Sequence, residues 1–288
     1  FRNIEALTLE PVNGVNIIYG ENYVSLGGAG TESAFEIANA RDKIDFSDAG
    51  VSVTLNLSDT TDINYINETT LTLDARTSIG YGKNTIYNVE DVVGGSGSDT
   101  LIGSSVGNVI DGGANNDILF GFGGSNTLIG GSGDDTILGL LSGDAIYGGT
   151  YDGTTATNSG SDWVDYSYIT LTDGRAINVD LSLGSNQVSQ VGNIANADTL
   201  THIENVVGTA NDDTLKGDDN FNIINSLLGY KGDDSFIVSK GSDYFDGGLG
   251  FNSVDYSSVD SANGGSKIVV DLGLSKATDN GYHLDPSG

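Results

Sequence analysis

The residues of this chain best suited to chemistry are aspartates that recur at a fixed spacing behind glycines. From position 94 to position 147 the sequence divides into six nine-residue blocks: GGSGSDTLI, GSSVGNVID, GGANNDILF, GFGGSNTLI, GGSGDDTIL and GLLSGDAIY. The residue at the sixth position is always Asp or its amide, Asn: Asp99, Asn108, Asp117, Asn126, Asp135 and Asp144. The eighth position is always apolar: Leu101, Ile110, Leu119, Leu128, Ile137 and Ile146. A phase held this strictly indicates a repeated structural unit.

The glycines and aspartates of each block together form a set of oxygen ligands. Glycine adopts backbone conformations that other residues resist, so a glycine-rich turn can point its carbonyl oxygens inward. Calcium takes about six to eight carbonyl and carboxylate oxygens, whereas Mg²⁺ takes fewer protein ligands and keeps its water. A single Asp in a turn usually bonds only its own backbone. A phased column of Asp behind paired glycines favours Ca²⁺ binding instead.

A second run of blocks begins at Gly208. It reads GTANDDTLK and GDDNFNIIN, slips by three residues, and continues as GYKGDDSFI, VSKGSDYFD and GGLGFNSVD. On this phasing the sixth positions are Asp213, Asn222, Asp234, Asp243 and Asn252, and the eighth are Leu215, Ile224, Phe236, Phe245 and Val254. A degenerate run is visible at 13–45, and the first full run is interrupted by an insertion at 151–159 before it resumes at Gly160.

The period itself predicts the architecture. Six turn residues followed by three extended ones make half a coil, so two blocks make one coil with two short strands, which stack into two parallel sheets. The eighth position then points into a narrow core, and positions seven and nine point away from it. Each coil buries little apolar surface, so stability requires stacking.

The blocks GGSGSDTLI and GGSGDDTIL resemble the G-G-x-G-x-D-x-U-x nonapeptide of RTX (hemolysin-type) calcium-binding proteins. The resemblance covers about 94–165 and 208–255 and is weak in 11–45. It implies an all-β, right-handed parallel β-roll with Ca²⁺ between stacked turns, type I secretion, and folding after export. We therefore expect an extracellular location at a bacterial cell surface.

Short motifs frame the runs and suggest the domain organisation. The motifs NIE, NVE and HIE precede the runs, the motifs DKIDFS, DWVDYS and NSVDYS close them, and alternating strand patterns follow at 51–55, 177–181 and 268–272. We expect a degenerate β-roll segment at 1–47, connector strands at 48–87, an RTX β-roll at 88–167, connector strands at 168–203, an RTX β-roll at 204–257 and a truncated connector at 258–288.

The same phase assigns the metal sites. Alternate blocks share an edge, so Asp99, Asp117, Asp135 and Asp162 form one column, in which we expect Ca²⁺. Asn108, Asn126 and Asp144 form the other, which should bind weakly or stay empty except near Asp144. In the second run the same rule favours a calcium site shared by Asp213 and Asp234. It assigns Asp243 to a site less clearly. The predicted calcium-binding set is Gly95, Gly97, Asp99, Gly113, Asp117, Gly131, Gly133, Asp135, Asp144, Asp162, Asp213, Gly232, Asp234 and Asp243.

Composition excludes several functions. Against 40 acidic residues there are only 11 Lys and Arg, a formal charge of −29, which disfavours nucleic acid as a partner. The absence of Cys excludes disulfides and thiolate metal sites. No apolar run reaches the roughly 20 residues of a membrane span. With only His202 and His283, no pair of histidines stands at metal-binding spacing, and we expect no enzymatic activity in these residues.

Three functions remain open at this point. The first is a calcium-binding structural β-roll region of a secreted cell-surface protein, of the adhesin or surface-layer type, that folds on binding Ca²⁺ outside the cell. The second is the calcium-binding C-terminal tail of a secreted protease, lipase or alginate epimerase. The third is a carbohydrate-binding module that uses the insertions at 31–41 and 151–159.

The expected partners are calcium, neighbouring copies of the chain and cell-surface polysaccharide. An apolar ladder at position nine, formed by Ile102, Phe120 and Leu138, points away from the roll core. It either packs within the chain, against the connector strands at 51–57 or 176–183, or contacts a partner chain.

Overall fold

The computed structural model describes part of the chain, and every structural statement below concerns that part. The described residues are 8–9, 15–19, 41–58, 62–65, 69–72, 77–79, 83–87, 89–139, 143–169, 176–185, 187–190, 193–220, 222–240 and 243–257. The strand pattern at 268–272, the glycine-rich stretch at 27–30 and nearly all of the insertion at 31–41 lie outside them.

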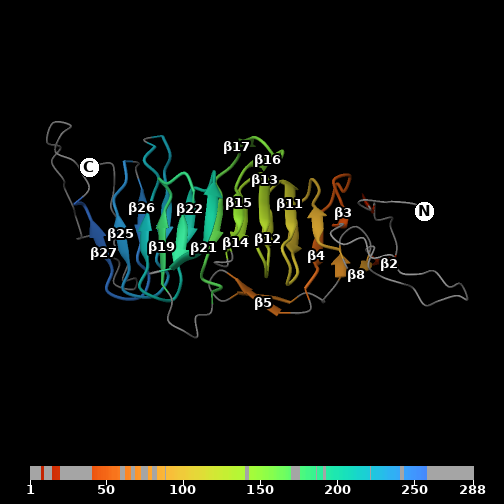
Figure 1. The fold of residues 1–288 in the computed structure, drawn as a ribbon, viewed down its shortest axis with the longest axis horizontal. Coiled ribbons are helices and arrows are strands. Elements are labelled where there is room, and N and C mark those ends of the chain that lie inside the picture. The colour runs from red at the N-terminus through yellow and green to blue at the C-terminus, as the bar shows by residue number, and fades with distance from the viewer. Residues whose placement is uncertain are drawn as a thin grey trace, which may run out of the picture.

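The fold is an all-β parallel roll built from two large sheets. The strands stack along one long axis, with β3 and β27 toward opposite ends (Figure 1). The first sheet has twelve strands in the order β1 (Thr8–Leu9), β3 (Lys43–Asp45), β9 (Asp91–Val93), β11 (Val109–Ala114), β13 (Thr127–Ser132), β15 (Ala145–Tyr147), β21 (Asn193–Thr201), β20 (Val188–Gln190), β19 (Ile177–Asp180), β23 (Thr214–Lys216), β25 (Ser235–Ile237) and β27 (Ser253–Asp255).

The second sheet has eleven strands and faces the first. Its order is β2 (Val15–Tyr19), β8 (Lys83–Tyr87), β7 (Thr77–Ile79), β4 (Thr54–Asn56), β10 (Thr100–Ile102), β12 (Ile118–Phe120), β14 (Thr136–Leu138), β18 (Trp163–Asp165), β22 (Asn205–Val207), β24 (Ser226–Leu228) and β26 (Tyr244–Asp246). Two small antiparallel pairs stand outside these sheets: β5 (Asp62–Tyr65) with β6 (Thr69–Thr72), and β16 (Thr150–Tyr151) with β17 (Ala156–Thr157). In the part of the chain that is described, no helix has the length and apolar character needed to cross a bilayer.

The strand register confirms that two blocks make one coil. In the first sheet Ile110 lies opposite Leu128, and Leu128 lies opposite Ile146. In the second sheet Leu101 lies opposite Leu119 in the same parallel manner. These eighth-position side chains are fully buried and form one continuous apolar core between the sheets. Each coil therefore adds one apolar side chain per sheet, and only stacking removes that side chain from water.

The phase of one block in the second run differs from the sequence prediction. The predicted core residue Ile224 is 64% exposed, whereas Leu227 is 0% exposed and lies in β24. Leu227 pairs with Val206 on one side and Phe245 on the other. The three-residue slip therefore falls within 217–225, before β24 rather than after it. The assignments of Asn222 and Ile224 to the sixth and eighth positions are wrong, and Asn225 and Leu227 take those positions.

The apolar ladder at position nine packs within the chain. Ile102, Phe120 and Leu138 point away from the main core but form a second buried cluster, joined by Ile118, Phe122 and Tyr168. The Phe120 ring meets the Tyr168 ring edge-on, with centroids 4.8 Å apart. Among the described hydrophobic residues the outer cover comes from Tyr168, which follows β18. Of the predicted 51–57, Asn56 lies beside Ile102 in the register of β4 and β10, and no residue of 176–183 joins the cluster. This ladder is therefore not free to contact a partner chain.

The segments expected to be connectors contribute strands to the two sheets. β4 pairs in parallel with β10, and β19 pairs in parallel with β23. The insertion at 151–159 lies in the hairpin β16–β17, next to β13 (Figure 1). The sheets thus run without a break through both predicted rolls, while the bounds of the six predicted segments remain predictions.

The corrected phase is testable with a matched pair of substitutions. Leu227→Ala should lower the free energy of unfolding by about 2–5 kcal/mol, because it opens a cavity in the core. Ile224→Ala, three residues earlier, should change it by less than about 0.5 kcal/mol, because that side chain is largely in water. Urea unfolding in saturating Ca²⁺ measures both values. A larger loss of stability for Ile224→Ala than for Leu227→Ala would support the original phase, with Ile224 in the core.

Candidate calcium-binding columns

The turns at one edge of the roll bring four predicted aspartates into a single buried column. Asp99, Asp117, Asp135 and Asp162 are each at most 1% exposed. One oxygen of each carboxylate accepts a backbone N–H from the coil before it. The N–H of Asp99 donates to Asp117 Oδ1 at 2.6 Å, that of Asp117 to Asp135 Oδ1 at 2.8 Å, and that of Asp135 to Asp162 Oδ1 at 2.9 Å. The aspartates thus form a side-chain ladder that joins successive coils.

Residues outside the nine-residue blocks end this ladder. At one end Val53 donates its N–H to Asp99 Oδ1, and at the other Asp162 donates its N–H to Glu204 Oε2. At the opposite edge Glu90 plays the same part, because its Oε2 accepts the N–H of Asp42. The NVE and HIE motifs mark these glutamates in the sequence, but no role was predicted for them. Their recurrence at the starts of the runs was the sequence signal that could have indicated this role.

The second oxygen of the middle aspartates has no partner in the described chain. Asp117 Oδ2, Asp135 Oδ2 and Asp162 Oδ2 are buried and accept no hydrogen bond. Asp99 Oδ2 differs, because it accepts the N–H of Gly95 at 2.7 Å. A buried carboxylate oxygen without a donor is costly, so each of the three needs a proton or a cation.

The first glycine of each block makes room for that oxygen. A methyl group on Gly112 would collide with Asp117 Oδ2 and lie 2.5 Å from the carbonyl oxygen of Gly130 in the next coil. A methyl group on Gly130 would likewise collide with Asp135 Oδ2 and with the carbonyl oxygen of Gly148. Each unpaired carboxylate oxygen therefore lies beside a stacked backbone carbonyl oxygen.

The second and fourth positions supply the sharp turn. Gly113, Gly131, Gly133 and Gly232 of the predicted set adopt left-handed φ values of +100°, +105°, +134° and +116°. Side chains other than Asn and Asp resist this region, and Asn115 at a fourth position adopts it with φ of 70°. Gly95 and Gly97 do not adopt it. They stack on the chain at 46–52, where a methyl on Gly97 would lie 2.5 Å from the Val51 carbonyl carbon.

The opposite edge of the roll carries the column rich in asparagine. The N–H of Asn108 donates to Asn126 Oδ1 at 2.8 Å, and that of Asn126 to Asp144 Oδ1 at 2.7 Å. The side-chain amide groups supply the further hydrogen bonds that this column needs. Asn126 Nδ2 donates to the Gly124 carbonyl and to Asp144 Oδ1, both at 3.1 Å. In these described turns the ladder is complete without a cation.

Asp198 continues this second column, although it is not among the residues predicted from the sequence. It lies in β21 rather than in a glycine-rich turn. Its Oδ1 accepts the N–H of Asp144 at 2.9 Å, and its Oδ2 accepts the Tyr166 hydroxyl at 2.9 Å. Because no block pattern surrounds it, only the three-dimensional register reveals its place.

The second run forms a shorter acidic ladder along the same edge as Asn108. The N–H of Asp213 donates to Asp234 Oδ1 at 2.8 Å, and that of Asp234 donates to Asn252 Oδ1 at 2.8 Å. Asp234 Oδ2 is buried and unpaired, whereas Asp213 Oδ2 accepts the N–H of Thr209 at 2.5 Å. Asp243 lies at the other edge, where its Oδ1 accepts the N–H of Asn225 at 3.3 Å. The structure therefore brings Asp213 and Asp234 together and leaves Asp243 apart from them.

A further ladder at position five was not expected. Asp134 donates its N–H to Asn116 Oδ1 at 3.1 Å and accepts the N–H of Ser161 at 2.9 Å. Asp233 likewise donates its N–H to Asp212 Oδ1 and accepts that of Phe251, both at 2.8 Å. The exposed Asp134 therefore joins adjacent coils as well as carrying a charge in water.

Burial shapes the electrostatics of both acidic ladders. Desolvation is the main cause that raises the pKa of Asp117 and of Asp234 to about 8, and of Asp162 to about 7, with neighbouring carboxylates adding to it. It raises the pKa of Asp135 and of Asp213 to about 6. The pKa values of Asp99 and Asp243 are raised by the same cause. The metal-free folded chain therefore holds carboxylates that resist ionisation near neutral pH.

The donor set fits calcium. The unpaired carboxylate oxygens lie beside stacked backbone carbonyl oxygens, and both are oxygen ligands of the kind that Ca²⁺ takes. Within the described ranges no three acidic or histidine side chains converge on one point. A bound ion would thus take its carboxylates from adjacent coils and the rest of its about six to eight ligands from backbone carbonyls.

Comparison with known proteins agrees with this chemistry. A family model described as "RTX calcium-binding nonapeptide repeat (4 copies)" matches residues 93–121, 120–150 and 221–254, which is less than half of the chain. These stretches are RTX repeats, and RTX nonapeptide repeats bind Ca²⁺. A 36-residue stretch is 72% identical to the protein described as "DNA replication and repair protein RecF" from Pseudoalteromonas translucida (strain TAC 125). That stretch covers 12% of this chain and 8% of that protein, so the chain spans less than a tenth of this relative.

The unequal columns predict unequal effects on metal binding. Asp117→Asn keeps an acceptor at Oδ1 but removes the charged Oδ2, so the variant should bind fewer Ca²⁺ ions than the original chain. Asn108→Ala should leave the number of bound ions unchanged, because its column leaves no carboxylate oxygen unpaired among the described turns. Calorimetric titration gives both stoichiometries. An equal loss in the two variants would contradict the assignment of columns.

The raised pKa values predict how the metal-free chain responds to pH. Asp117 has an ordinary pKa of 3.8 and a folded pKa of about 8, so the folded chain binds this proton more tightly than the unfolded chain does. Stability in excess chelator should therefore be greatest at low pH and fall as the pH rises from about 4 to about 8. Circular dichroism between pH 5 and pH 8 measures this loss.

The control for this pH series is the double variant Asp117→Asn, Asp234→Asn. It should lose less structure over the same range, because two of the groups that release protons are gone. A metal-free chain that gains structure as the pH rises would show the opposite sign and refute this account.

Proposed function

We propose that the chain is a calcium-binding structural β-roll region of a secreted bacterial cell-surface protein, of the adhesin or surface-layer type, that folds when Ca²⁺ binds outside the cell. The main observation that supports this proposal is the buried column of Asp117, Asp135 and Asp162, whose second carboxylate oxygens have no partner in the described chain. RTX repeats form the structural, non-catalytic, calcium-binding part of secreted proteins.

Calcium-dependent folding follows from the balance, in each coil, between the gain from burying apolar side chains and the cost of burying a carboxylate. A coil gains the burial of one apolar side chain per sheet, such as Leu119 and Leu128, but must also bury a carboxylate. Burying an unpaired charge costs several kcal/mol, which is comparable to what the apolar side chains contribute. A ligand that binds only the folded chain adds RT ln(1 + [L]/Kd) to its stability, so the fold depends on the calcium concentration around it.

The metal sites that we propose are those predicted from the sequence. The geometry supports Asp117, Asp135, Asp162 and Asp234 as ligands, with Asp99 and Asp213 at the ends of their ladders, and Gly113, Gly131, Gly133 and Gly232 in the turns. Gly95, Gly97, Asp144 and Asp243 have less support, because the two glycines lack the left-handed turn and both aspartates lie outside the ladders with unpaired oxygens.

The uninterrupted sheets favour a scaffold over an enzyme tail. Strands from both intervening segments enter the sheets, so the described residues form one continuous rod rather than rolls hung between linkers. RTX repeats as such are compatible with a tail on a secreted protease, lipase or epimerase. The domain content of the complete gene product, read from its intact mass and peptide map, would separate these two functions.

Partners other than calcium are proposed as neighbouring copies of the chain or cell-surface polysaccharide. The buried ladder of Ile102, Phe120 and Leu138 serves neither of them. The local identity to the protein described as RecF supplies no DNA-related function, because it is short and because a chain of formal charge −29 repels phosphate.

The central test is the response of the chain to a chelator. At neutral pH in excess chelator, circular dichroism should show a largely disordered chain, because the acidic columns repel. Addition of Ca²⁺ should restore the β spectrum, whereas Mg²⁺ at the same concentration should not, since it keeps its water. Full β structure in excess chelator would contradict the proposal.

A further inference from the structure

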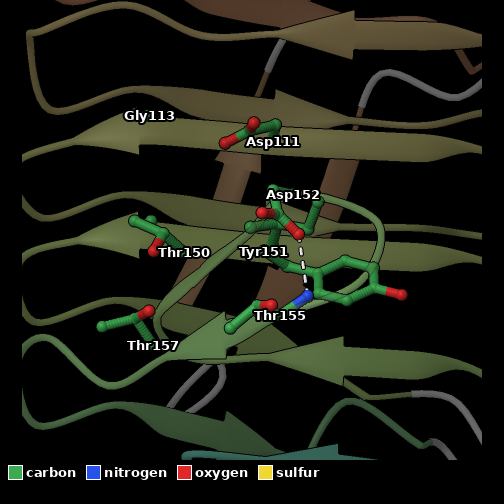
Figure 2. Close-up of a pocket in the computed structure, with 9 residues that line it drawn as sticks. Asp111, Gly113, Thr150, Tyr151, Asp152, Thr155 and Thr157 are labelled. Carbon is green, nitrogen blue, oxygen red and sulfur yellow. Dashed lines mark hydrogen bonds between the residues drawn. The ribbon is translucent and has the colours of Figure 1, made fainter.

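The insertion at 151–159 builds a pocket on the outer face of the roll. The hairpin β16–β17 folds back over β11 and β13 of the twelve-stranded sheet and leaves a pocket of about 310 Å³ (Figure 2). Asp111, Ile129 and the glycine backbone at 113 and 131 line the side of the sheet. Thr150, Tyr151, Thr155 and Thr157 line the side of the hairpin. None of the acidic ladders contributes a side chain to it.

Local hydrogen bonds fix the shape of the hairpin. Asp152 Oδ1 accepts the N–H of Thr154 at 2.9 Å and that of Thr155 at 2.7 Å, which closes the turn, and Gly153 takes a left-handed φ of +92°. Farther along, the Ser159 hydroxyl donates to the Gly131 carbonyl at 2.7 Å. A pocket held this way loses little freedom when a ligand enters.

The lining combines free hydroxyls, the carboxylates of Asp111 and Asp152, and an aromatic ring. Within the described residues the hydroxyls of Thr150, Thr155 and Thr157 engage no protein partner, and Figure 2 shows them gathered with Asp111 around the pocket. The Tyr151 ring stacks on Tyr147 with centroids 4.0 Å apart and planes within 6°. Hydroxyl and carboxylate groups bind ligand hydroxyls, while Tyr151 and Ile129 offer apolar contact to a C–H face. A sugar ring presents both kinds of surface.

Two other ligand classes fit less well. A divalent cation would need more carboxylates, but Asp152 is committed to its turn, and in the described ranges no three acidic side chains converge. An acidic sugar would meet the carboxylates of Asp111 and Asp152 in a chain of formal charge −29. The remaining class is an uncharged sugar.

We propose that the pocket between the hairpin β16–β17 and strands β11 and β13 binds one uncharged hexose or N-acetylhexosamine unit of a polysaccharide. Asp111 and the threonine hydroxyls hold its hydroxyl groups, and Tyr151 packs on its C–H face. This inference rests on the proposed polysaccharide partner and gives that partner a site and a chemical class.

The pocket is also coupled to the calcium column. Asn158 in the insertion donates to Glu204 Oε1 at 3.1 Å, and the other oxygen of Glu204 accepts the N–H of Asp162. The insertion itself lies within the turn that ends at Asp162. Sugar binding should therefore require the calcium-loaded chain and disappear in chelator.

The test is binding of the calcium-loaded full chain to an array of uncharged glucans, mannans, galactans and N-acetylhexosamine polymers, with alginate and sialylated glycans beside them. Calorimetry on the best ligand then compares Thr157→Val and Asp111→Asn with the control Thr136→Val on the opposite sheet. Each pocket variant should lose affinity about fivefold to tenfold, the effect of one or two hydrogen bonds, while the control keeps it.

Three results would overturn the inference: no binding to any uncharged glycan by a chain whose circular dichroism shows it folded, preference for the acidic glycans, or unchanged affinity in both pocket variants. Calcium titration of the same variants should match the original chain. A chain that folds fully without calcium would defeat the proposed function instead, and the glycan measurement would still decide the pocket.

Discussion

The structure depends on one interaction repeated along its length: a buried aspartate that accepts a backbone N–H from the preceding coil with one oxygen and leaves the other unpaired. The first oxygen holds adjacent coils at a fixed spacing, as between Asp117 and Asp135. The second makes each coil incomplete without a cation, as at Asp117 Oδ2. The glycines follow from this arrangement, because a side chain at Gly112 would occupy the space of that oxygen. Calcium is therefore a structural part of the roll rather than an addition to it.

The two edges of the roll show what this interaction costs. Where asparagine replaces aspartate, as at Asn126, the amide group donates to neighbouring oxygens and the ladder closes by itself. Where aspartate stays, burial raises the pKa, to about 8 for Asp117, and the metal-free fold favours a proton. One chain thus combines a self-sufficient column, from Asn108 to Asp144, with acidic ladders at Asp117 and Asp234 whose buried carboxylates respond to a cation.

The periodic part of the fold could be predicted from the sequence because each block repeats the same local physics. The core residues Leu101 to Ile146 and the column of Asp99 to Asp162 follow from counting by nine. The rest depends on contacts between distant segments. The slip that buries Leu227 instead of Ile224 lies in an irregular turn, and Glu204 and Asp198 take column positions from segments without the block pattern. Tyr168 covers the outer ladder for a similar reason, since no periodicity indicates it.

The insertion between Gly148 and Asp162 shows how such a scaffold gains a binding surface, because its hairpin uses the rigid sheet as a floor. On the proposed function, the folded roll requires cations in the aspartate column. The most direct measurement is anomalous diffraction from crystals of the chain grown with Ca²⁺. We predict peaks beside Oδ2 of Asp117, Asp135, Asp162 and Asp234, and none beside Asn108 or Asn126. An ordered roll without metal at the aspartates, or with metal along the asparagine column, would contradict the account.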